Sequence, residues 1–478
     1  MSEQFDVVGV GAGTAGIPTA IEAADGGARV LLIEKDRRLG GTLHTTGGHV
    51  VAAGTKRQAE HGIEDTPEAW IADIRRITRD GYRPDIIDPV VEHATEFVDW
   101  LDEHGFKFAP ETPRIVYGHE PYTTPRTYYG PDAGVSILDV LTPVLDEHVA
   151  AGRVTVWTDA PAIGLIQDDD DRPGAVTGVH VLHRGKDVEV YADAVVLATG
   201  GFAANPEMFE ELEGYPLVSG AHPTSTGDGL VIAKEAGAAY QGQGLYLPAF
   251  GGLPHPTTPG RVQWEERPVL TQERPPWEIY VDRHGKRWVA EDEPSIDAKE
   301  RALVAETDDL TFWTILDDQG VQESVPLVVN WSPDDVRAKA NVREGVNKAD
   351  TLAELAAIIG VDEAGLLETV AKYNEYVDKG EDPDFGRTFL PARIEKGPFY
   401  AMRNHGVSLL TFIGIDVDGQ MRVRREDGSI IEGLYAVGEA IGGAATTGQS
   451  FCSGMMITPG AVHGRLLGRR LAAATQSS

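Results

Sequence analysis

The sequence predicts an α/β fold in which a Rossmann-like dinucleotide-binding domain is split in sequence by an inserted α+β capping domain. Three observations carry this prediction: a glycine turn between two short apolar runs at the N-terminus, an apolar run at 194–201 ending in Thr-Gly-Gly, and a further run entering a glycine turn at 433–439. The region between the last two is rich in proline and scattered aromatics. We therefore expect residues 1–235 and 406–478 to form the split domain and residues 236–405 to form the cap.

The N-terminal segment has every part of a dinucleotide site in order. An apolar run, a glycine turn, a helix-like stretch, a second apolar run and an acid follow one another, at Phe5–Val10, Gly11–Gly16, Ile17–Ala24, Arg29–Ile33 and Glu34. Gly11 allows the tight turn, Gly13 lets the backbone approach a pyrophosphate, and Gly16 lets the helix pack on the strand. Glu34, eighteen residues after Gly16, is placed to accept hydrogen bonds from a ribose. The segment therefore predicts a dinucleotide site.

Periodicity predicts the other elements. Apolar residues at three- and four-residue spacings predict helices at 67–80, 88–104, 134–151, 350–379 and 457–473. Alternation predicts a strand at 154–157 and a hairpin of 176–183 with 188–192, turning at Arg184-Gly185. The wholly apolar run at 194–201 is typical of a central parallel strand that reaches a cofactor.

Composition excludes several classes of function. The chain has 478 residues, enough for two domains, and 42 basic against 75 acidic residues give a net charge of −33. Nucleic acid and anionic membrane surfaces would be repelled, so neither is expected as a partner. There is no apolar run of about eighteen residues, so we expect neither a membrane span nor a signal peptide, and a cytoplasmic protein. The single cysteine, Cys452, excludes an internal disulfide, and no metal-ligand spacing is found.

Motifs along nearly the whole chain resemble a flavoprotein family. After the first glycine turn come Gly40-Gly41-Thr42, Ala198–Phe202, Thr226–Gly229, Gly285–Trp288 and Gly433–Glu439. In this order they resemble the family of soluble fumarate reductases, succinate dehydrogenase flavoprotein subunits and 3-ketosteroid dehydrogenases. The resemblance implies FAD as cofactor, an FAD-binding domain split by a mobile cap, and a small-molecule substrate with an unidentified electron acceptor.

The resemblance also implies which residues hold FAD. Glu34 would bind the adenosine ribose and Glu439 the ribityl chain. The full set is Gly11, Gly13, Thr14, Ala15, Gly16, Glu34, Lys35, Gly40, Gly41, Thr42, Gly47, Gly48, Ala198, Thr199, Gly200, Asp228, Gly438, Glu439, Ser453 and Met455. We expect the FAD to be noncovalent, because the histidine that carries FAD in some relatives lies three residues further along this loop than His44.

The charged ligands of a dicarboxylate site are largely missing. FAD in such a site moves a hydride between flavin N5 and a substrate carbon, while a protein group handles the proton on the adjacent carbon. Fumarate and succinate enzymes hold the two carboxylates with arginines and histidines, and they use an arginine as the proton donor. Here the matching positions hold Ser295 for the proton-donating arginine, Phe451 for the carboxylate-binding arginine, and 408–411 (Ser-Leu-Leu-Thr) for His-His-Thr. A dianion would be left uncompensated, at a cost of several kcal/mol, so we expect neither fumarate nor succinate as substrate.

The ketosteroid dehydrogenase branch fits better. There a glycine N–H and a tyrosine hydroxyl polarise the ketone, and the matching positions are Gly454 and Ser450. Two further tyrosines in that branch act as base and helper. The matching loops contain Tyr117, Tyr122, Tyr128, Tyr129 and Tyr246, of which Tyr246, Tyr122 and Tyr129 are the preferred candidates. The substrate remains open between a cyclic ketone or ketosteroid-like compound and a keto-acid whose carboxylate meets His255 or Arg126.

Three functions are therefore compared. The preferred one is an FAD-dependent dehydrogenase, or an ene-type reductase if run backwards, that acts on a C=C bond alpha,beta to a carbonyl. The alternative is a fumarate reductase-like reductase of an unsaturated carboxylic acid. The third, a flavin-binding electron-transfer subunit of a complex, is disfavoured because the proline-rich cap predicts a substrate chamber.

Overall fold

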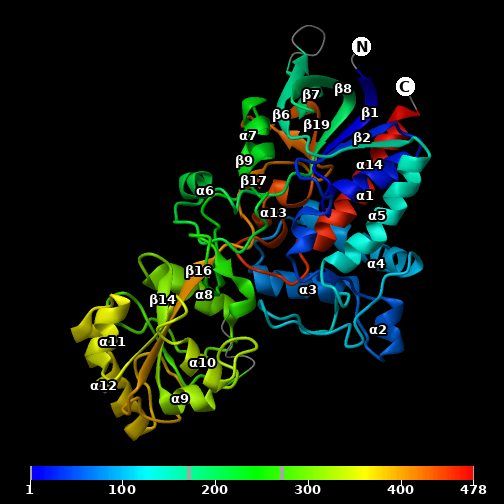
Figure 1. The fold of residues 1–478 in the computed structure, drawn as a ribbon. Helices are drawn as coiled ribbons and strands as arrows, with labels where there is room; N and C mark the ends of the chain where they lie inside the picture. The colour runs from blue at the N-terminus through cyan, green and yellow to red at the C-terminus, as the bar shows by residue number, and fades with distance from the viewer. Residues whose placement is uncertain (1–2, 169–173, 268, 270–273, 477–478) are drawn as a thin grey trace. The chain divides into compact units, whose positions relative to one another are not determined.

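The structure is a computed structural model that describes residues 3–168, 174–267, 269 and 274–476 (Figure 1). The chain divides into two compact units. The first unit consists of Met1–Gly214, Ala221–Tyr246 and Leu410–Ser478, and the second of Tyr215–Gly220 and Leu247–Leu409. The glycine turns at 11–16 and 433–439 thus belong to one unit although more than four hundred residues separate them.

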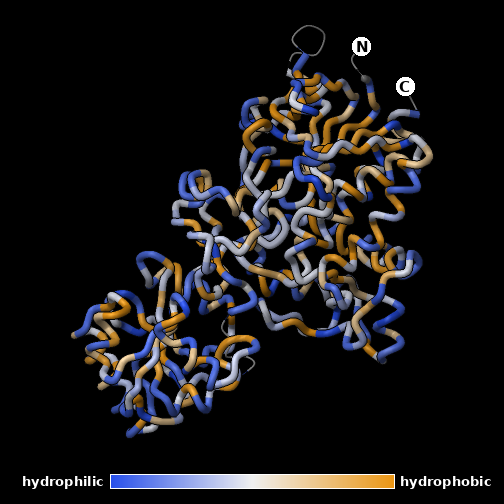
Figure 2. The backbone as a smooth tube through the Cα atoms, in the orientation of Figure 1, coloured by the Kyte–Doolittle hydropathy of each residue, from blue (hydrophilic) through white to orange (hydrophobic). Residues whose placement is uncertain are grey.

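The first unit is built on a sheet whose strands β19, β8, β1, β2 and β5 run parallel in that order. Their bounds are Ile430–Ala436, Lys186–Leu197, Glu3–Val10, Val30–Ile33 and Val154–Trp157. Strand β18 (Arg422–Arg424) adds an antiparallel edge. Every residue of β2 is buried, as in a strand covered on both faces. Hydrophobic colouring follows β1 and β2 in Figure 2.

The predicted hairpin is present, and its second strand is longer than expected. β6 (Ala162–Asp168) and β7 (Ala175–His183) precede β8, and the turn uses Arg184 and Gly185, both with positive φ (52° and 74°). The residue pattern predicted a hairpin strand at 188–192 separate from the central strand at 194–201. In the structure a single strand, β8, takes both places: its first half pairs with β7 and its second half with β19, while β1 pairs along its other edge.

Helices α1 (Gly16–Asp25) and α14 (Ile457–Thr475) pack against each other through small residues. A Cβ on Gly468 would lie 2.5 Å from the Thr19 carbonyl oxygen, and one on Gly464 would collide with the Ala15 carbonyl. No described helix has the length and apolar character that a bilayer crossing needs.

The remaining elements of the first unit include three predicted helices. These are α3 (Pro67–Thr78), α4 (Pro84–Glu103) and α5 (Val135–Ala150). Helix α4 begins earlier than predicted because Pro84 starts it at a position that suits proline. The shorter elements are α2 (Lys56–Glu60), α6 (Pro206–Glu213), α7 (Asp228–Glu235), α13 (Gly443–Thr447), η1 (Gly41–His44), η3 (Gly438–Ile441), β3 (Val50–Val51), β4 (Thr127–Tyr128), β9 (Tyr240–Gln241) and β17 (Gly414–Ile415).

The second unit is an antiparallel sheet with helices. Strands β10 (Ala249–Phe250), β16 (Phe399–Val407), β14 (Thr311–Asp317) and β13 (Ile279–Val281) lie in that order, and β15 (Val346–Ala349) also pairs with β16. The predicted helix at 350–379 is two helices, because Gly360 ends the first in a left-handed conformation (φ 71°). The other elements are β11 (Leu253–Pro254), β12 (Val262–Gln263), η2 (Trp264–Glu266), α8 (Ile296–Glu306), α9 (Asp318–Glu323), α10 (Pro333–Lys339), α11 (Leu352–Ile359) and α12 (Glu363–Lys379).

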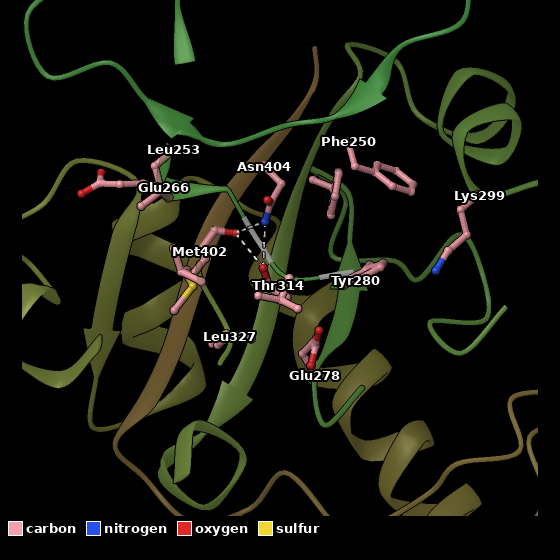
Figure 3. A pocket seen from close by; sticks show the side chains of 13 residues that line it. Phe250, Leu253, Glu266, Glu278, Tyr280, Lys299, Thr314, Leu327, Met402 and Asn404 are labelled. Carbon is pink, nitrogen blue, oxygen red and sulfur yellow. Dashed lines mark hydrogen bonds between the residues drawn. The ribbon is translucent and has the colours of Figure 1, made fainter. Parts of the chain in front are cut away.

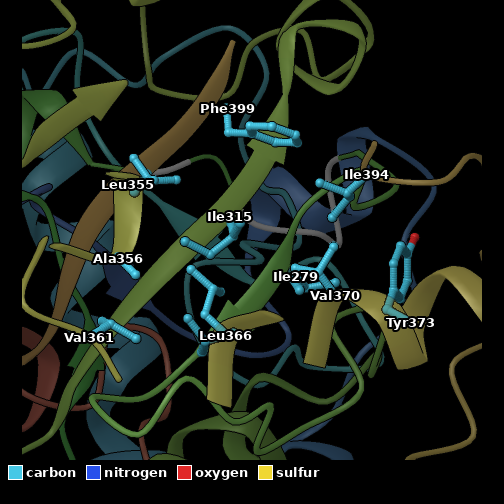
Figure 4. Packing of buried hydrophobic residues seen from close by; sticks show 12 residues of the cluster. Ile279, Ile315, Leu355, Ala356, Val361, Leu366, Val370, Tyr373, Ile394 and Phe399 are labelled. Atoms are coloured by element: carbon cyan, nitrogen blue, oxygen red, sulfur yellow. The ribbon is translucent and has the colours of Figure 1, made fainter. Parts of the chain in front are cut away.

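Alternation along the strands of the second unit produces two different faces. Ile315 of β14 and Ile279 of β13 pack with Leu355, Leu366 and Val370 of the helices α11 and α12 (Figure 4). Successive side chains of a strand point to opposite faces. The intervening residues of β14 therefore line the other face, which carries a pocket described below.

Candidate functional site

The glycine turn between β1 and α1 has two crowded positions and an open one. Gly11 (φ +99°) could not carry a Cβ, which would lie 2.5 Å from the Ala198 carbonyl oxygen, and a Cβ on Gly16 would collide with the Gly11 carbonyl. A Cβ on Gly13 would meet only one described atom, the Gly40 oxygen at 3.9 Å. The space at Gly13 is therefore available for an anion that approaches the N-terminus of α1.

Glu34 is held at the turn by backbone donors. Its carboxylate accepts the Ala12 N–H at one oxygen and the Asp36 N–H at the other, both at 2.9 Å. The side chain is mostly buried, with 8% exposed. Each carboxylate oxygen keeps a further lone pair, so a ribose hydroxyl can still donate to it.

Lys35 and Asp228, both predicted to hold the cofactor, contact each other. The Lys35 ammonium donates to Asp228 Oδ2 at 2.7 Å and to Thr226 Oγ1 at 2.6 Å. The Thr226 hydroxyl donates to the other Asp228 oxygen at 2.7 Å. This network joins the end of β2 to the start of α7.

The second glycine loop, residues 40–48, is tied to the first. The Gly40 N–H donates to the Ala12 carbonyl at 2.8 Å. Gly41 has a positive φ (+47°), and a Cβ placed on it would have no described atom within 4 Å. Gly48 (φ +70°), in contrast, is crowded by the backbone that precedes α5. The loop therefore presents an open glycine beside the first turn.

The end of β8 and residue Glu439 supply the remaining predicted contacts. The Ala198 N–H donates to Val10 O at 2.8 Å, and beyond it Gly200 (φ +74°) is open, with no described atom within 4 Å of a Cβ. The Thr411 N–H donates to Glu439 Oε1 at 3.1 Å. Burial raises the pKa of Glu439 to about 7, although its hydrogen bonds with Thr411 oppose the shift.

Taken together, these residues fit a dinucleotide. The open positions at Gly13, Gly41 and Gly200 all follow elements at the C-terminal edge of the parallel sheet, where ligands of such sheets bind. Close packing accounts for Gly438, whose Cβ would lie 3.0 Å from the Ala15 Cβ. The described residues contain no group of three or more histidine, cysteine or acidic side chains able to hold a metal.

The segment 450–454 contains the predicted ketone-polarising residues. The Ser450 hydroxyl donates to the Ile77 carbonyl at 2.9 Å, so it is engaged with backbone in this structure. Gly454 (φ +74°) must be glycine, because a Cβ would lie 2.8 Å from Val51 Cγ1. No hydrogen bond from the Gly454 N–H to another described residue is found. Ser453 and Met455 flank it, and the Ser453 hydroxyl is buried without a hydrogen-bond partner among the described residues.

The three preferred tyrosines have different surroundings. The Tyr122 hydroxyl donates to the Ser453 carbonyl at 2.8 Å, and burial, with Cys452 nearby, raises its pKa well above the ordinary value. The Tyr129 hydroxyl donates to Glu111 at 2.7 Å, and burial and Glu111 raise its pKa too. Tyr246 is buried, with its ring edge-on to neighbouring aromatics. Neither Tyr122 nor Tyr129 thus has the depressed pKa that a tyrosinate base needs.

The candidate carboxylate partners are engaged elsewhere. The Arg126 guanidinium is fully buried and bonded to Asp65 (2.7 Å) and Asp73 (2.6 Å), so it is not available to a keto-acid. His255 belongs to the second unit, where its Nδ1 accepts the Thr257 N–H at 3.3 Å. Ser295, at the position of the proton-donating arginine, caps helix α8 by accepting the Ala298 N–H.

Two histidines that the motifs did not reveal lie beside the 450–454 segment. His119 stacks on Phe451, with ring centroids 5.0 Å apart and an 18° interplanar angle. Burial lowers the pKa of His49 to about 4, with a contribution from Arg114, and burial together with His49 lowers the pKa of His119 to about 4. Both imidazoles are therefore neutral at pH 7. No local motif marks them, since their contacts come from segments distant in sequence.

These side chains form an aromatic wall in the first unit. Phe451 meets Phe412 edge-on (5.4 Å, 79°), and Phe412 meets Tyr246 edge-on (6.2 Å, 90°). We call His119, Phe451, Phe412 and Tyr246 the aromatic wall. At the position where the resemblance places a carboxylate-binding arginine, the wall presents a phenyl ring that is 5% exposed.

The second unit has a pocket on the sheet face opposite α11 and α12 (Figure 3). The space between its walls, including the part open to solvent, is about 520 Å³. Its apolar walls include Phe250 and Met402, and Asn404 donates to Thr314 Oγ1 at 2.8 Å within it. Burial lowers the pKa of Lys299, which also lines the pocket, to about 8. None of the residues predicted from the sequence to form a site lines this pocket.

Comparison with known proteins identifies the family. The family model described as FAD binding domain matches residues 6–454. The chain is 31% identical over 477 residues to a fumarate reductase (cytochrome) of Shewanella frigidimarina, covering 98% of this chain and 77% of that protein. It is 28% identical over 555 residues to a 4-oxocyclohexanecarboxylate 2-dehydrogenase of Sinomonas cyclohexanicum, covering 98% and 93%. The structure of a 3-ketosteroid-Δ4-(5α)-dehydrogenase from Rhodococcus jostii RHA1, in complex with 4-androstene-3,17-dione, matches with a TM-score of 0.71 at 25% identity, covering 98% and 97%.

The fold and the glycine cradle define an FAD-dependent oxidoreductase that acts on CH–CH or C=C groups. The chain belongs to the FAD-binding flavoprotein family that includes these reductases and dehydrogenases, and its cofactor is FAD. The family, the Rossmann-like fold and the cofactor predicted from the motifs are confirmed.

Proposed function

We propose that the protein introduces, or in reverse reduces, a C=C bond alpha,beta to the carbonyl of an uncharged cyclic ketone. The observation that carries this proposal is the set of ring contacts of Phe451, which are Phe412 and the neutral His119; the resemblance seen in the sequence would place a diacid enzyme's arginine at this position. A dianion beside such a wall would lose its hydration without a compensating charge. The similarity to a 4-oxocyclohexanecarboxylate 2-dehydrogenase supports the ring ketone only, because the substrate in that name also carries a carboxylate.

The residues of this chain have separate roles in the proposal. The bound FAD supplies a hydride acceptor, or donor, at flavin N5. The Gly454 N–H, which has no partner among the described residues, donates to the ketone oxygen and makes the adjacent C–H more acidic. Tyr246, held edge-on by Phe209 (5.2 Å) and Phe412 (6.2 Å), takes the proton from the alpha carbon in its phenolate form and becomes a phenol, which returns the proton in the reverse reaction.

Other residues predicted from the sequence have supporting roles. Tyr122 and Tyr129 donate their hydroxyls to Ser453 O and Glu111, and so position the loop rather than act as bases. Ser450 would assist the ketone only if its bond to Ile77 O were exchanged. The substrate contact expected of His255 stays a prediction.

Two anaerobic measurements test the proposal. Cyclohexanone added to the oxidised enzyme should bleach the visible flavin absorbance, and cyclohex-2-en-1-one should reoxidise the dithionite-reduced enzyme. Fumarate at the same concentration should do so at least about a hundredfold more slowly, because a dianion lacks its counter-charges. Reoxidation by fumarate but not by the enone would overturn the proposal.

A reductase of an unsaturated carboxylic acid is the second candidate. It is favoured by the 31% identity to the Shewanella frigidimarina fumarate reductase (cytochrome) over nearly the whole chain. Fumarate, acrylate and urocanate as oxidants of the reduced enzyme distinguish this candidate from the first.

We also propose that FAD is held noncovalently. His44, the histidine of the 40–48 loop nearest to the paired glycines, already bonds through Nε2 to Leu39 O at 2.8 Å. Precipitation of the holoenzyme with acid should leave the flavin in the supernatant. Flavin that stays with the precipitated chain would contradict this.

A further inference from the structure

His119 is fixed beside Phe451 by pairing between two distant segments. Glu120 forms a parallel β-bridge with Cys452, and the Tyr122 hydroxyl donates to the Ser453 carbonyl at 2.8 Å. These contacts hold the 117–122 loop along the 450–454 segment. The imidazole of His119 consequently lies flat on the Phe451 ring, at one end of the aromatic wall.

The polar edge of His119 lacks a partner among the described residues. Its Nδ1 atom is buried and makes no hydrogen bond with them. A buried polar atom without a partner is costly, and such atoms in native proteins call for an explanation. A neutral imidazole has one N–H donor and one acceptor nitrogen, so either tautomer leaves Nδ1 able to bond to a ligand.

The surroundings restrict what that ligand can be. The stacked Phe451 ring and the edge-on Phe412 ring give the site flat apolar surfaces. The backbone of this region also carries the Gly454 N–H, and a Cβ on Gly454 would lie 3.3 Å from the His49 carbonyl oxygen. Arg114, whose charge acts on His49, is exposed and donates to the Tyr129 hydroxyl at 3.2 Å. The described polar groups beside the wall thus include the neutral His49 and His119 and the carboxyl group of Glu213, which accepts the Phe412 N–H at 3.1 Å, and none of these three offers a positive charge to a ligand.

We infer that His119 is a substrate-binding residue that stacks on Phe451 and donates a hydrogen bond from its Nδ1–H to the carbonyl oxygen of an uncharged cyclic ketone. This inference rests on the proposed function, and it adds a residue that selects the substrate class. The imidazole of His119 recognises the carbonyl oxygen of the ketone, and the phenyl ring of Phe451 excludes a carboxylate. His119 thus determines specificity without contributing charge.

Two substitutions separate the stacking from the hydrogen bond. H119F keeps a flat ring against Phe451 but removes the nitrogen, whereas H119N keeps hydrogen-bonding atoms and removes the ring. Cyclohexanone is titrated into each holoenzyme and its Kd is taken from the change in flavin absorbance. We expect H119F to raise the Kd about tenfold and H119N to recover part of the loss.

The control variant is H61N. His61 ends helix α2, is exposed, and bonds through Nδ1 to Arg57 O at 2.8 Å. It should leave the Kd unchanged. Thermal unfolding and the FAD content of each variant show whether the fold and the cofactor site persist. A merely structural role of His119 would change these two measurements and leave the Kd of the folded enzyme untouched.

The outcomes separate this inference from the proposed function. If wild-type flavin responds to cyclohexanone and H119F, with FAD retained, binds it with the wild-type Kd, the inference is overturned. If H119F fails to retain FAD, the pair H119A and H119Q is compared instead, and equal Kd values for the two overturn it. If wild-type enzyme responds to no ketone, the proposed function itself fails.

Discussion

Two side-chain clusters of this molecule handle charge in opposite ways. The aromatic wall of the first unit holds His119 in a neutral state. In the second unit, Glu291 is paired with Arg287 (2.6 Å) and Arg387 (2.9 Å), and all three side chains are at most 4% exposed. Burial raises the pKa of Glu291, but the two guanidinium groups outweigh it and hold the pKa below its usual value.

The difference shows when burial preserves a charge. A buried ion keeps its charge only where partners replace the lost hydration, as the two arginines do for Glu291. His119 has no such partner among the described residues, so it loses its proton instead. The charges of Glu291 and the two arginines thus stabilise the fold of the second unit. The side chains of the aromatic wall, in contrast, are uncharged.

The largest effect is expected from breaking the ion pairs. E291A would leave Arg287 and Arg387 buried with less compensation, and should lower the free energy of unfolding by about 3–5 kcal/mol. Chemical denaturation measures this. E368A removes the exposed partner of Lys286 and serves as the control, with no change in the denaturation midpoint expected. A wild-type midpoint for E291A would contradict the role given to pairing.

Acid should destabilise the protein through His49. Its pKa is about 4 in the folded protein against 6.5 in the unfolded chain, so the neutral form is favoured by folding. The stabilisation is complete above pH 6.5 and is lost as the pH falls toward 4, by on the order of 3 kcal/mol. The melting temperature of H49N should fall less than that of wild type between pH 7 and pH 4.5. Parallel curves would contradict the neutral assignment.

Glu213 should have the opposite pH dependence. Burial raises the pKa of Glu213 to about 6. The hydrogen bonds that its carboxylate accepts from the Ile413 and Phe412 N–H groups oppose this shift. Its stabilisation is complete below pH 4.5 and is lost as the pH rises through 6, by on the order of 2 kcal/mol. The side chain of E213Q stays neutral, so the melting temperature of this variant should change less with pH over that range than the melting temperature of the wild type. A melting temperature of E213Q that falls more steeply with rising pH than that of the wild type would contradict the prediction.

The smallest effect on the fold is expected from Gly13. G13A should leave the melting temperature of the apoprotein unchanged, because the new Cβ meets only Gly40 O at 3.9 Å among the described atoms. It should nevertheless weaken FAD binding about tenfold or more, because the methyl group lies where the pyrophosphate approaches. G164A, another substitution at ordinary contact distance (3.8 Å), is the control for FAD affinity. Equal FAD affinity of G13A and G164A would contradict the place given to the pyrophosphate.

Local signals predicted much of the fold. The strand, glycine turn, helix and acid at the N-terminus, the helices α3 and α5, and the turn at Gly185 were all predictable, because periodicity and glycine conformation act over a few residues. The continuity of β8 was missed, because polar residues in its first half suggested an edge hairpin while its second half is central. The break at Gly360 was missed because apolar spacing continues on both sides of it.

The sequence by itself determined the glycine turn at Gly11–Gly16 and the aromatic side chain at Phe451. Both follow from residue identity, since only glycine tolerates the backbone at Gly11 and a phenyl ring cannot hold a charge. Tertiary structure alone decided that His119 stacks on Phe451 and that Arg126 is bound by two aspartates. Such contacts join segments far apart in the chain, and the protonation of each group depends on the water that packing removes.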